Sequence, residues 1–281
     1  MSERETFGER LFDVSRRRGR LCVGIDPHPE LLKNWGLSVD LMGLRTFSEI
    51  CVAAFGSTAA LVKPQVAMYE AFGSGGYAVL EQTIQDLRAQ GALVLADAKR
   101  GDIGSTMAAY ARAWLADESP LCSDAVTVSP YLGFGSLQPA LELAKATGRG
   151  IFVLAATSNP EGRQVQSSIT TSGERLDELM VAEASACNAP YKAARVFGYV
   201  GVVIGATLKQ VPDVTGLNGP VLMPGVGAQG ADAADVARIA KEANAWAFPN
   251  MSREILKVGP NTEKLAAAVT SAAKDYPEKS A

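Results

Sequence analysis

The chain has 281 residues, of which 47% are hydrophobic and 20% are charged, with a formal net charge of −3 and an isoelectric point near 5.4. This composition is typical of globular proteins, and its slight acidity argues against nucleic acid as the main partner. No run of about 18 apolar residues is present, so we expect no membrane span. The first seven residues lack the apolar core of a secretory signal. Four widely spaced cysteines and a single histidine argue against a structural zinc site or a disulfide framework. We therefore expect a cytoplasmic protein.

Eight short apolar runs rich in Val, Ile and Leu recur along the chain. Nearly continuous apolar character is typical of parallel strands that are covered on both faces. The predicted strands span residues 21–26, 61–66, 93–99, 125–129, 150–157, 200–207, 220–226 and 245–250.

Segments with the apolar spacing of helices lie between these runs, at residues 44–55, 77–90, 105–116, 136–147, 173–187, 231–243 and 262–274. The connection at 208–214 is the weakest because Pro212 interrupts it. Eight strands in alternation with helices favour one (β/α)8 TIM barrel over an open doubly wound sheet. We therefore predict a single α/β barrel domain over residues 1–281, with an extra N-terminal helix at 4–20 that closes the bottom of the barrel.

Charged residues collect where the first three predicted strands end, the edge at which barrels carry their active sites. Asp26 ends the first strand and Lys63 the second. Asp97 and Lys99 end the third strand, and Asp102 lies just beyond it. Side chains alternate along a strand, so Asp97 and Lys99 should point the same way. Because a buried charge without a partner is strongly unfavourable, we expect the two lysines to alternate with Asp97 and Asp102 in one network.

The two carboxylates restrict the chemistry that Lys99 can perform. A lysine that forms a Schiff base has to lose its proton near neutral pH. Asp97 and Asp102 should instead keep the Lys99 side chain charged. This favours proton donation to a carbanion over attack on a carbonyl, and Asp97 would repel a carboxylate held beside it.

A glycine-rich segment follows the seventh predicted strand. Gly225, Gly227 and Gly230 precede a helical pattern that starts near Ala231, and Arg253 follows the eighth strand. Backbone N–H groups in such a loop and a helix N-terminus attract phosphate, which barrels often bind after strands 7 and 8. We therefore predict a phosphate site completed by a bidentate contact from Arg253, with a merely tight turn as the alternative.

Short polar residues end the fifth predicted strand, in the segment TSNP at 157–160. They are suited to orienting a hydrogen-bonding ring or amide, although a simple turn has the same composition. The segment that follows, 158–172, is the longest candidate for an active-site loop.

The segment at 95–106, LADAKRGDIGST, resembles the signature of the orotidine 5′-phosphate decarboxylase family, in the form found in its longer bacterial members. The Asp-x-Lys-x-x-Asp core alone is shared with a wider group of sugar-phosphate barrels, whereas the flanking residues make the match specific. Further segments follow in the family's order: GID at 24–26, KP at 63–64, TSNP at 157–160, PGVGAQG at 224–230 and SR at 252–253.

The resemblance implies conversion of orotidine 5′-phosphate to uridine 5′-phosphate (UMP) and CO₂, the last step of de novo pyrimidine synthesis, without a metal or an organic cofactor. It implies that Lys99 donates a proton to C6 of the pyrimidine and that Asp97 sits against the departing carboxylate. The implied substrate contacts are Lys63 and Asp26 at ribose hydroxyls, Ser158 at the pyrimidine edge, and Gln229, Ser252 and Arg253 at the phosphate.

The resemblance also implies a homodimer with shared active sites. In the family, the second aspartate of the signature and the threonine after it reach into the neighbouring subunit. Asp102 and Thr106 would therefore cross a dimer interface, and Ile103 would add an apolar wall near the carboxylate. The segment 211–219 would be a mobile lid over the phosphate.

Two positions depart from the family pattern or match it ambiguously. Many members have Gly before the phosphate-binding arginine, where this sequence has Ser252, so the backbone contact at that point stays open. Either hydroxyl of Thr157 and Ser158 could match the serine that reads the pyrimidine, and we assign Ser158.

Three other functions are compatible with parts of the sequence. One is a magnesium-dependent decarboxylase or epimerase of a phosphorylated keto-sugar, built on the same Asp-x-Lys-x-x-Asp core. The second is a Schiff-base aldolase that uses Lys99. The third is a barrel that binds a phosphate ligand without catalysis.

Overall fold

The computed structural model of the protein describes residues 4–277, without the side chains of residues 244 and 245. Residues 1–3 and 278–281 lie outside the described residues. The predicted domain, residues 1–281, includes these terminal residues, and the N-terminal segment that is predicted to lack a secretory signal includes residues 1–3.

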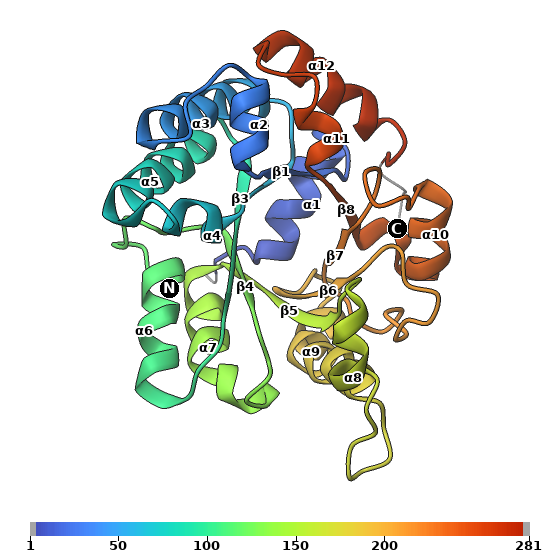
Figure 1. The fold of residues 1–281 in the computed structure, drawn as a ribbon. Coiled ribbons are helices and arrows are strands. Elements are labelled where there is room, and N and C mark those ends of the chain that lie inside the picture. Colours follow the sequence, from blue (N-terminus) through green and yellow to red (C-terminus); the bar gives the residue numbers. More distant parts are fainter. Residues whose placement is uncertain (1–3, 278–281) are drawn as a thin grey trace.

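Eight parallel strands close into a barrel in sequence order, with β8 paired to β1 (Figure 1). The predicted TIM barrel is therefore confirmed. The strands are β1 (Cys22–Ile25), β2 (Leu61–Pro64), β3 (Leu93–Arg100), β4 (Ala125–Val128), β5 (Gly150–Ala156), β6 (Val200–Ile204), β7 (Val221–Pro224) and β8 (Ala247–Met251).

Helices surround the barrel and connect its strands (Figure 1). The longer ones are α3 (Leu41–Phe55), α5 (Gly73–Ala89), α6 (Gly104–Leu115), α7 (Gln138–Thr147), α9 (Leu176–Ala193), α10 (Ala233–Ala240) and α12 (Thr262–Ala273). Short helices are α2 (Pro29–Asn34), α4 (Val66–Glu70), α8 (Arg163–Gln166) and α11 (Arg253–Leu256), with 3-10 turns η1 (Phe134–Leu137), η2 (Pro160–Gly162) and η3 (Lys241–Trp246).

The regular alternation of strands and helices breaks once. The chain between Ile204 and Val221, all of it described, forms turns and bends rather than a helix. Pro212 lies in this stretch and has no N–H to donate to a helical hydrogen bond. The sequence also placed the start of the eighth strand at residue 245, whereas η3 delays it to Ala247.

The N-terminal helix α1 (Phe7–Arg18) lies across the barrel at the end opposite the carboxyl ends of the strands (Figure 1). Thr6 and Glu9 form a capping box at its start, which satisfies backbone N–H groups that a helix end leaves free. Phe7 is fully buried, and its ring meets that of Phe152 edge to face at 5.9 Å between centroids. The extra helix that the sequence predicted therefore closes the bottom of the barrel.

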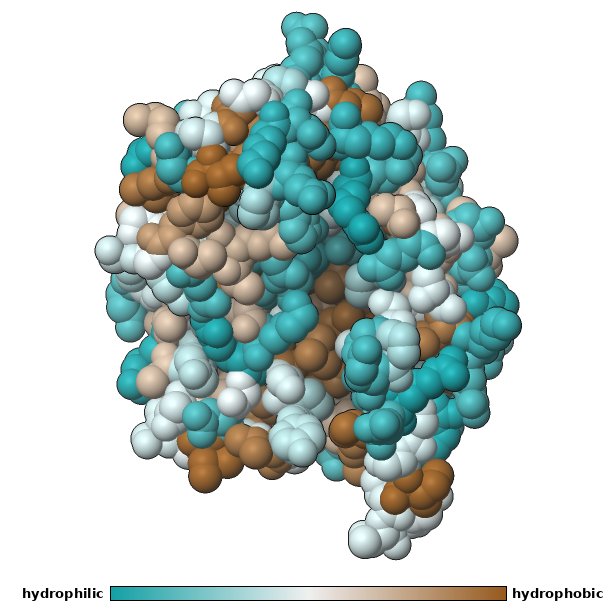
Figure 2. All heavy atoms as spheres, in the orientation of Figure 1, coloured by the Kyte–Doolittle hydropathy of each residue, from teal (hydrophilic) through white to brown (hydrophobic). Residues whose placement is uncertain are grey.

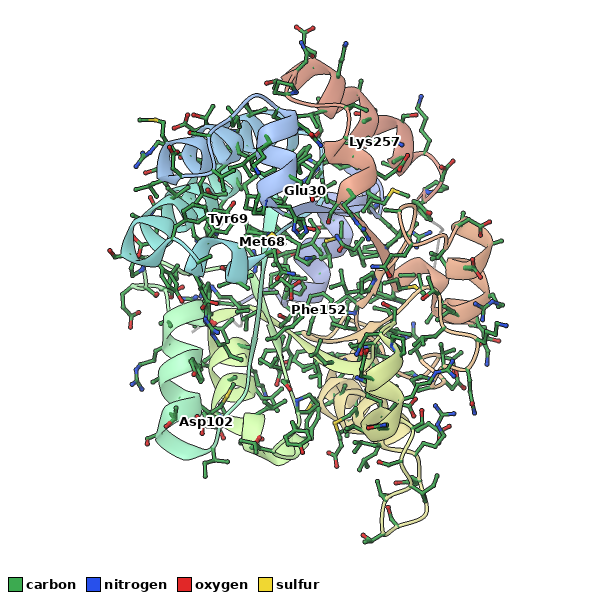
Figure 3. All side chains as sticks on the ribbon, in the orientation of Figure 1. Glu30, Met68, Tyr69, Asp102, Phe152 and Lys257 are labelled. Carbon is green, nitrogen blue, oxygen red and sulfur yellow. The ribbon has the colours of Figure 1, made fainter. Side chains whose placement is uncertain are left out.

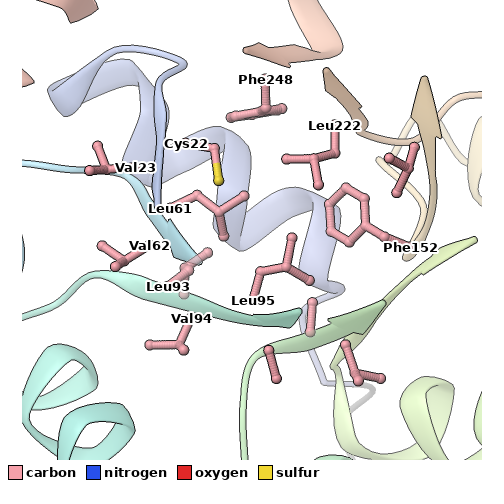
Figure 4. Packing of buried hydrophobic residues seen from close by; sticks show 14 of the residues in the cluster. Cys22, Val23, Leu61, Val62, Leu93, Val94, Leu95, Phe152, Leu222 and Phe248 are labelled. Carbon is pink, nitrogen blue, oxygen red and sulfur yellow. The ribbon is translucent and has the colours of Figure 1, made fainter. Parts of the chain in front are cut away.

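Large apolar side chains fill the barrel interior below its mouth. Figure 4 shows Leu61, Leu95 and Phe152 pointing toward one another inside the barrel, whereas Val62 and Val94 point away. All five are fully buried because the strands are covered on both faces. This packed layer forms a rigid floor, and side chains further along the same strands emerge above it.

Candidate active site

A cavity of about 570 Å³ opens at the carboxyl ends of the strands. Figure 2 shows it as a hollow with hydrophobic residues at its depth and hydrophilic residues around it. Its volume lies within the range of sites that hold small-molecule ligands. Residues from every strand, or from the loop just after it, contribute to its lining. The site therefore lies where a barrel places its chemistry.

The charged groups of the cavity follow from strand alternation. Lys63 and Asp97 each lie two residues beyond an interior leucine, Leu61 and Leu95 respectively, and line the cavity just above the packed layer. The Lys63 ammonium donates to Asp97 Oδ2 at 2.8 Å, and the Lys99 ammonium donates to Asp97 Oδ1 at 2.6 Å. One carboxylate therefore stands between two ammonium groups, with a different oxygen facing each.

The two ion pairs of Asp97 differ in burial. The side chains of Lys63 and Asp97 are 5% and 8% exposed, whereas that of Lys99 is 46% exposed and reaches the open cavity. Burial opposes ionisation of Asp97, but Lys63 and Lys99 outweigh it and hold the pKa of this carboxyl well below its usual range. Burial likewise opposes the charge on Lys63, yet Asp97 and Asp26 raise the pKa of this amine above its ordinary value. Both partners of the buried pair are therefore ionised at neutral pH.

Lys99 reaches the cavity from an irregular backbone. Its φ is +48°, in the left-handed region that few residues other than glycine adopt, and the register between β3 and β4 shifts between Ala96 and Arg100. The next residue, Arg100, holds the end of the strand. Its guanidinium pairs with Glu70 and lies 5.5 Å from the ring centroid of Tyr110. Asp97 and Lys99 do face the same cavity, but a kink rather than simple alternation sets the position of Lys99.

Two residues that the sequence pattern did not single out also hold Asp97. Thr127 on β4 donates its hydroxyl to Asp97 Oδ1 at 3.0 Å. With its amide turned so that both polar atoms are satisfied, Gln65 donates to Asp97 Oδ2 at 3.2 Å. Four donors thus surround one carboxylate. Thr127 is the one residue of β4 that lines the cavity, and no pattern in the sequence distinguishes it from a threonine that only packs in a strand.

Asp26 lines the cavity next to this network. Its Oδ1 is buried, and none of the described residues donates a hydrogen bond to it. An unpaired buried carboxylate oxygen is costly, so a ligand hydroxyl is its natural partner. Asp26 can therefore bind a donor on a ligand, which agrees with the contact to a ribose hydroxyl that the family resemblance implies.

Ser158 and Thr157 both line the cavity, but their hydroxyls have different partners. The Thr157 hydroxyl lies 2.6 Å from Asn159 Oδ1 and accepts from Gln166 Nε2 at 2.8 Å, within its own loop. The Ser158 hydroxyl donates to Gln229 Oε1 at 3.3 Å, across the cavity mouth from the segment after β7. Ser158 is therefore the freer of the two to contact a ligand, and it lies beside Gln229, one of the residues predicted to bind the phosphate.

The glycine-rich loop after β7 contributes less than the sequence predicted. Gly225, Gly227 and Gly230 all have positive φ, but only Gly225 lines the cavity. The expected helix N-terminus near Ala231 is also absent from the site. The helix α10 begins at Ala233, and the side chain of Asp232 already accepts from its first free N–H groups.

The other half of the predicted phosphate site does line the cavity. Ser252 and Arg253 follow β8, at the start of the short helix α11. Ser252 packs closely on β1, because a Cβ at Gly24 would lie 1.8 Å from its hydroxyl oxygen. Only glycine fits at position 24 while this serine lies opposite. Arg253 places a permanent positive charge at the mouth, suited to an anionic group.

Besides Gly227 and Gly230, three predicted site residues lie outside the cavity of this chain. Asp102 accepts a hydrogen bond from the backbone of Ile103 at 2.7 Å and makes no contact with the two lysines. Figure 3 places Asp102 just before the N-terminus of α6, well away from the cavity residue Met68. Ile103 is 62% exposed, and Thr106 is also exposed. Of the four residues predicted to form the charged network, a single chain therefore brings together only Lys63, Asp97 and Lys99.

The described part of the chain contains neither a metal-binding cluster nor a membrane-spanning helix. In residues 4–277, no group of three or more His, Cys, Asp or Glu side chains is placed to hold a metal ion. Over the same described span, no helix is long and apolar enough to cross a membrane.

Comparisons with known proteins agree with this geometry. Residues 19–268 match the model of the orotidine 5′-phosphate decarboxylase / HUMPS family. The chain is 60% identical over 273 residues to orotidine 5′-phosphate decarboxylase of Corynebacterium efficiens, covering 97% of this chain and 98% of the relative. It is 58% identical over 272 residues to the enzyme of the same name from Corynebacterium glutamicum, with the same two coverages.

Solved structures with names from the same family are also similar to this chain. A structure from Streptomyces avermitilis, described as a candidate orotidine 5′-phosphate decarboxylase, has a TM-score of 0.94 and 51% identity, covering 98% of this chain and 95% of that one. The OMP decarboxylase of Leishmania donovani has a TM-score of 0.74 and 26% identity, covering 96% of this chain and 97% of that one. The family match spans most of the sequence and all eight strands, so the chain belongs to the orotidine 5′-phosphate decarboxylase / HUMPS family.

Proposed function

We propose that this protein converts orotidine 5′-phosphate to UMP and CO₂, with Lys99 as the proton donor. The observation that carries the proposal is the carboxylate of Asp97 held between the ammonium groups of Lys63 and Lys99 at the base of a cavity of nucleotide size. The names of the relatives at 58–60% identity support the same substrate.

The reaction breaks the bond between C6 and its carboxylate and leaves the electron pair on C6. That carbanion is poorly delocalised by the ring, so a nearby cation is the available stabiliser. The Lys99 ammonium, already placed by its bond to Asp97, then transfers a proton to C6. The ionised Asp97 would lie against the substrate carboxylate, and departure of CO₂ relieves their repulsion.

The far end of the cavity fixes the substrate for this step. Arg253 and Gln229 line the end near the segments after β7 and β8, where a phosphate would bind, and Asp26 offers its free oxygen to a ribose hydroxyl. Binding energy from these groups, which do not react, can hold C6 beside Lys99. Ser158, which lies beside Gln229, would read the pyrimidine edge.

The same geometry weighs against a magnesium-dependent reaction on a phosphorylated keto-sugar. Each oxygen of Asp97 already accepts from an ammonium group, at 2.6 and 2.8 Å. A divalent cation would have to displace those donors and then lie next to two positive charges. We therefore propose that the decarboxylation needs no metal and, as the family resemblance implies, no organic cofactor.

We further propose that the active protein is a homodimer in the cytoplasm. The exposure of Ile103 and Thr106 and the distance of Asp102 from its own cavity support a role for these residues at a neighbouring subunit. A biosynthetic step on soluble nucleotides supports the location.

A spectrophotometric assay tests the function directly. Purified protein treated with EDTA is mixed with orotidine 5′-phosphate, and the ultraviolet change that accompanies its consumption is followed. Turnover that is unchanged by EDTA is expected. Activity that appears only on addition of Mg²⁺ would favour the keto-sugar reaction, and inactivation by borohydride in the presence of substrate would favour a Schiff base on Lys99.

A further inference from the structure

Thr127 connects the two central residues of the site through a single hydroxyl group. It lies on β4, is 1% exposed, and its side chain lines the cavity. Its Oγ1 is 3.0 Å from Asp97 Oδ1 and 2.9 Å from the backbone nitrogen of Lys99.

Chemistry fixes the direction of both hydrogen bonds. An ionised carboxylate only accepts, and a backbone N–H only donates. The one hydroxyl proton of Thr127 must therefore point at Asp97, and its oxygen must accept from Lys99. Removal of the hydroxyl would leave the Lys99 N–H without this acceptor, which is costly for a backbone group that water does not reach.

The bond to Lys99 holds a strained piece of backbone. Strands β3 and β4 pair regularly at Leu95 and Ala96, lose register, and pair again at Arg100. Inside this break, Lys99 has a φ of +48°. A non-glycine residue in that region persists only when its surroundings hold it there. The side chain of Thr127 satisfies the Lys99 N–H within the break in the ladder.

Packing alone does not explain a threonine at this position. The neighbouring residues on β4 are Val126 and Val128, and a valine would fill the same space as Thr127. Burying a hydroxyl is unfavourable unless it forms hydrogen bonds. Its two polar contacts are therefore what distinguishes Thr127 from its neighbours.

We propose that Thr127 is a positioning residue that aims the Lys99 ammonium at the reacting carbon by holding both the Lys99 backbone and the Asp97 carboxylate. This inference rests on the proposed decarboxylation. A misplacement of about 1 Å in a reacting group can cost about 100-fold in rate. Loss of the hydroxyl should therefore lower kcat far more than it affects substrate binding.

The test compares three variants with the wild-type protein. In Thr127→Val, which keeps the shape, kcat for orotidine 5′-phosphate should fall about 10- to 100-fold while KM and the Kd of UMP change less than about 3-fold. Thr127→Ser, which keeps the hydroxyl, should recover most of kcat. Thr83→Val is the matched control, because Thr83 is also buried but donates to the backbone of its own helix α5; its kcat should stay near wild type.

Hydrogen exchange of the Lys99 amide supplies a readout that does not depend on turnover. The amide should exchange at least about 10-fold faster in Thr127→Val than in the wild type or in Thr127→Ser. If Thr127→Val does not fold, Thr127→Cys takes its place, because its thiol is of similar size but is a weak hydrogen-bonding group.

Several results would overturn the proposal. They are a wild-type kcat in Thr127→Val, an equal loss of kcat in Thr127→Val and Thr127→Ser, a rise in KM with kcat intact, or an unchanged rate of hydrogen exchange at the Lys99 amide. Failure of the proposed function looks different, because the wild-type protein would then not consume orotidine 5′-phosphate. The exchange measurement would still decide whether Thr127 holds the Lys99 backbone.

Discussion

Replacing Asp97 by Asn tests the electrostatic organisation of the site through stability. The two side chains have nearly the same shape, but Asn removes the charge and exchanges one acceptor oxygen for an NH₂ donor. In the wild-type protein that carboxylate accepts from Lys63, Lys99 and Thr127. Either orientation of the Asn amide would therefore point a donor at another donor.

The expected magnitude follows from the burial of Lys63. Its side chain is only 5% exposed, so Asp97→Asn leaves a buried ammonium without its closest anion. Removing one partner of a buried ion pair typically costs about 3–5 kcal/mol. The remaining attraction from Asp26 should offset part of this cost. For a protein of this size the loss corresponds to a decrease in Tm on the order of 10 °C.

Urea and thermal unfolding, followed by circular dichroism at pH 7, measure the effect. Glu254→Gln is the control, because Glu254 pairs with Lys257 on the surface, and exposed pairs contribute only about 0–1 kcal/mol. If Asp97→Asn lowers the free energy of unfolding no more than this control does, the Lys63–Asp97 pair behaves like a solvated pair. Burial would then not strengthen it, and the reasoning from burial would be refuted.

Three further predictions concern pH, the phosphate and the subunit interface. The pKa of Asp97 is lowered in the folded state, so the stability that its ionised form contributes is fully present above the ordinary Asp pKa of about 3.9 and is lost as pH falls through the lowered value. The difference in the free energy of unfolding between wild type and Asp97→Asn should therefore stay constant from about pH 5 to 8 and shrink below about pH 4. A difference that shrinks with rising pH would have the wrong sign. Arg253→Ala should raise KM about 10- to 100-fold, the size expected for a charge-assisted hydrogen bond, and the phosphate-free nucleoside should lose less; an equal loss would remove Arg253 from the phosphate role. Mixing inactive Asp102→Ala subunits with inactive Lys99→Ala subunits should restore one intact site in each hybrid dimer, and no recovery would place Asp102 outside the shared site.

The barrel could be predicted from sequence because its signal is strong and repeated. Strands buried on both faces need nearly continuous apolar runs, and each of the eight runs overlaps an observed strand. The boundaries of single elements carry a weaker signal. The predicted helix at 231–243 is in fact the shorter α10 followed by η3, and the capping box of Asp232 and Asp235 was the sequence signal for its true start.

The charged residues of the site could also be predicted, because a charge that directly follows a buried apolar strand needs a partner of opposite sign nearby. Lys63, Asp97 and Lys99 come together as expected. Thr127 could not be singled out in the same way, since a threonine is a common strand residue and only its contacts distinguish it from a packing residue. Asp102 was expected in the network, but a single chain does not bring it to Lys99.

The kink at Lys99 also had no sequence signal. Non-glycine residues rarely adopt a positive φ, so the default expectation is a regular strand. The observed conformation depends on contacts from other strands and helices, including Thr127 and the pairing of Arg100 with Glu70. Tertiary contacts of this kind are not encoded in a local pattern.

One measurement tests the central role of Lys99 most directly: the turnover of orotidine 5′-phosphate by Lys99→Ala, alongside its affinity for UMP. Loss of a preorganised cation from the reacting centre should lower kcat by at least about 1,000-fold, while the Kd of UMP changes only a few-fold because Arg253, Gln229 and Asp26 remain. Turnover within about 10-fold of the wild type would contradict the account, since the proton and the stabilising charge would then have to come from another group.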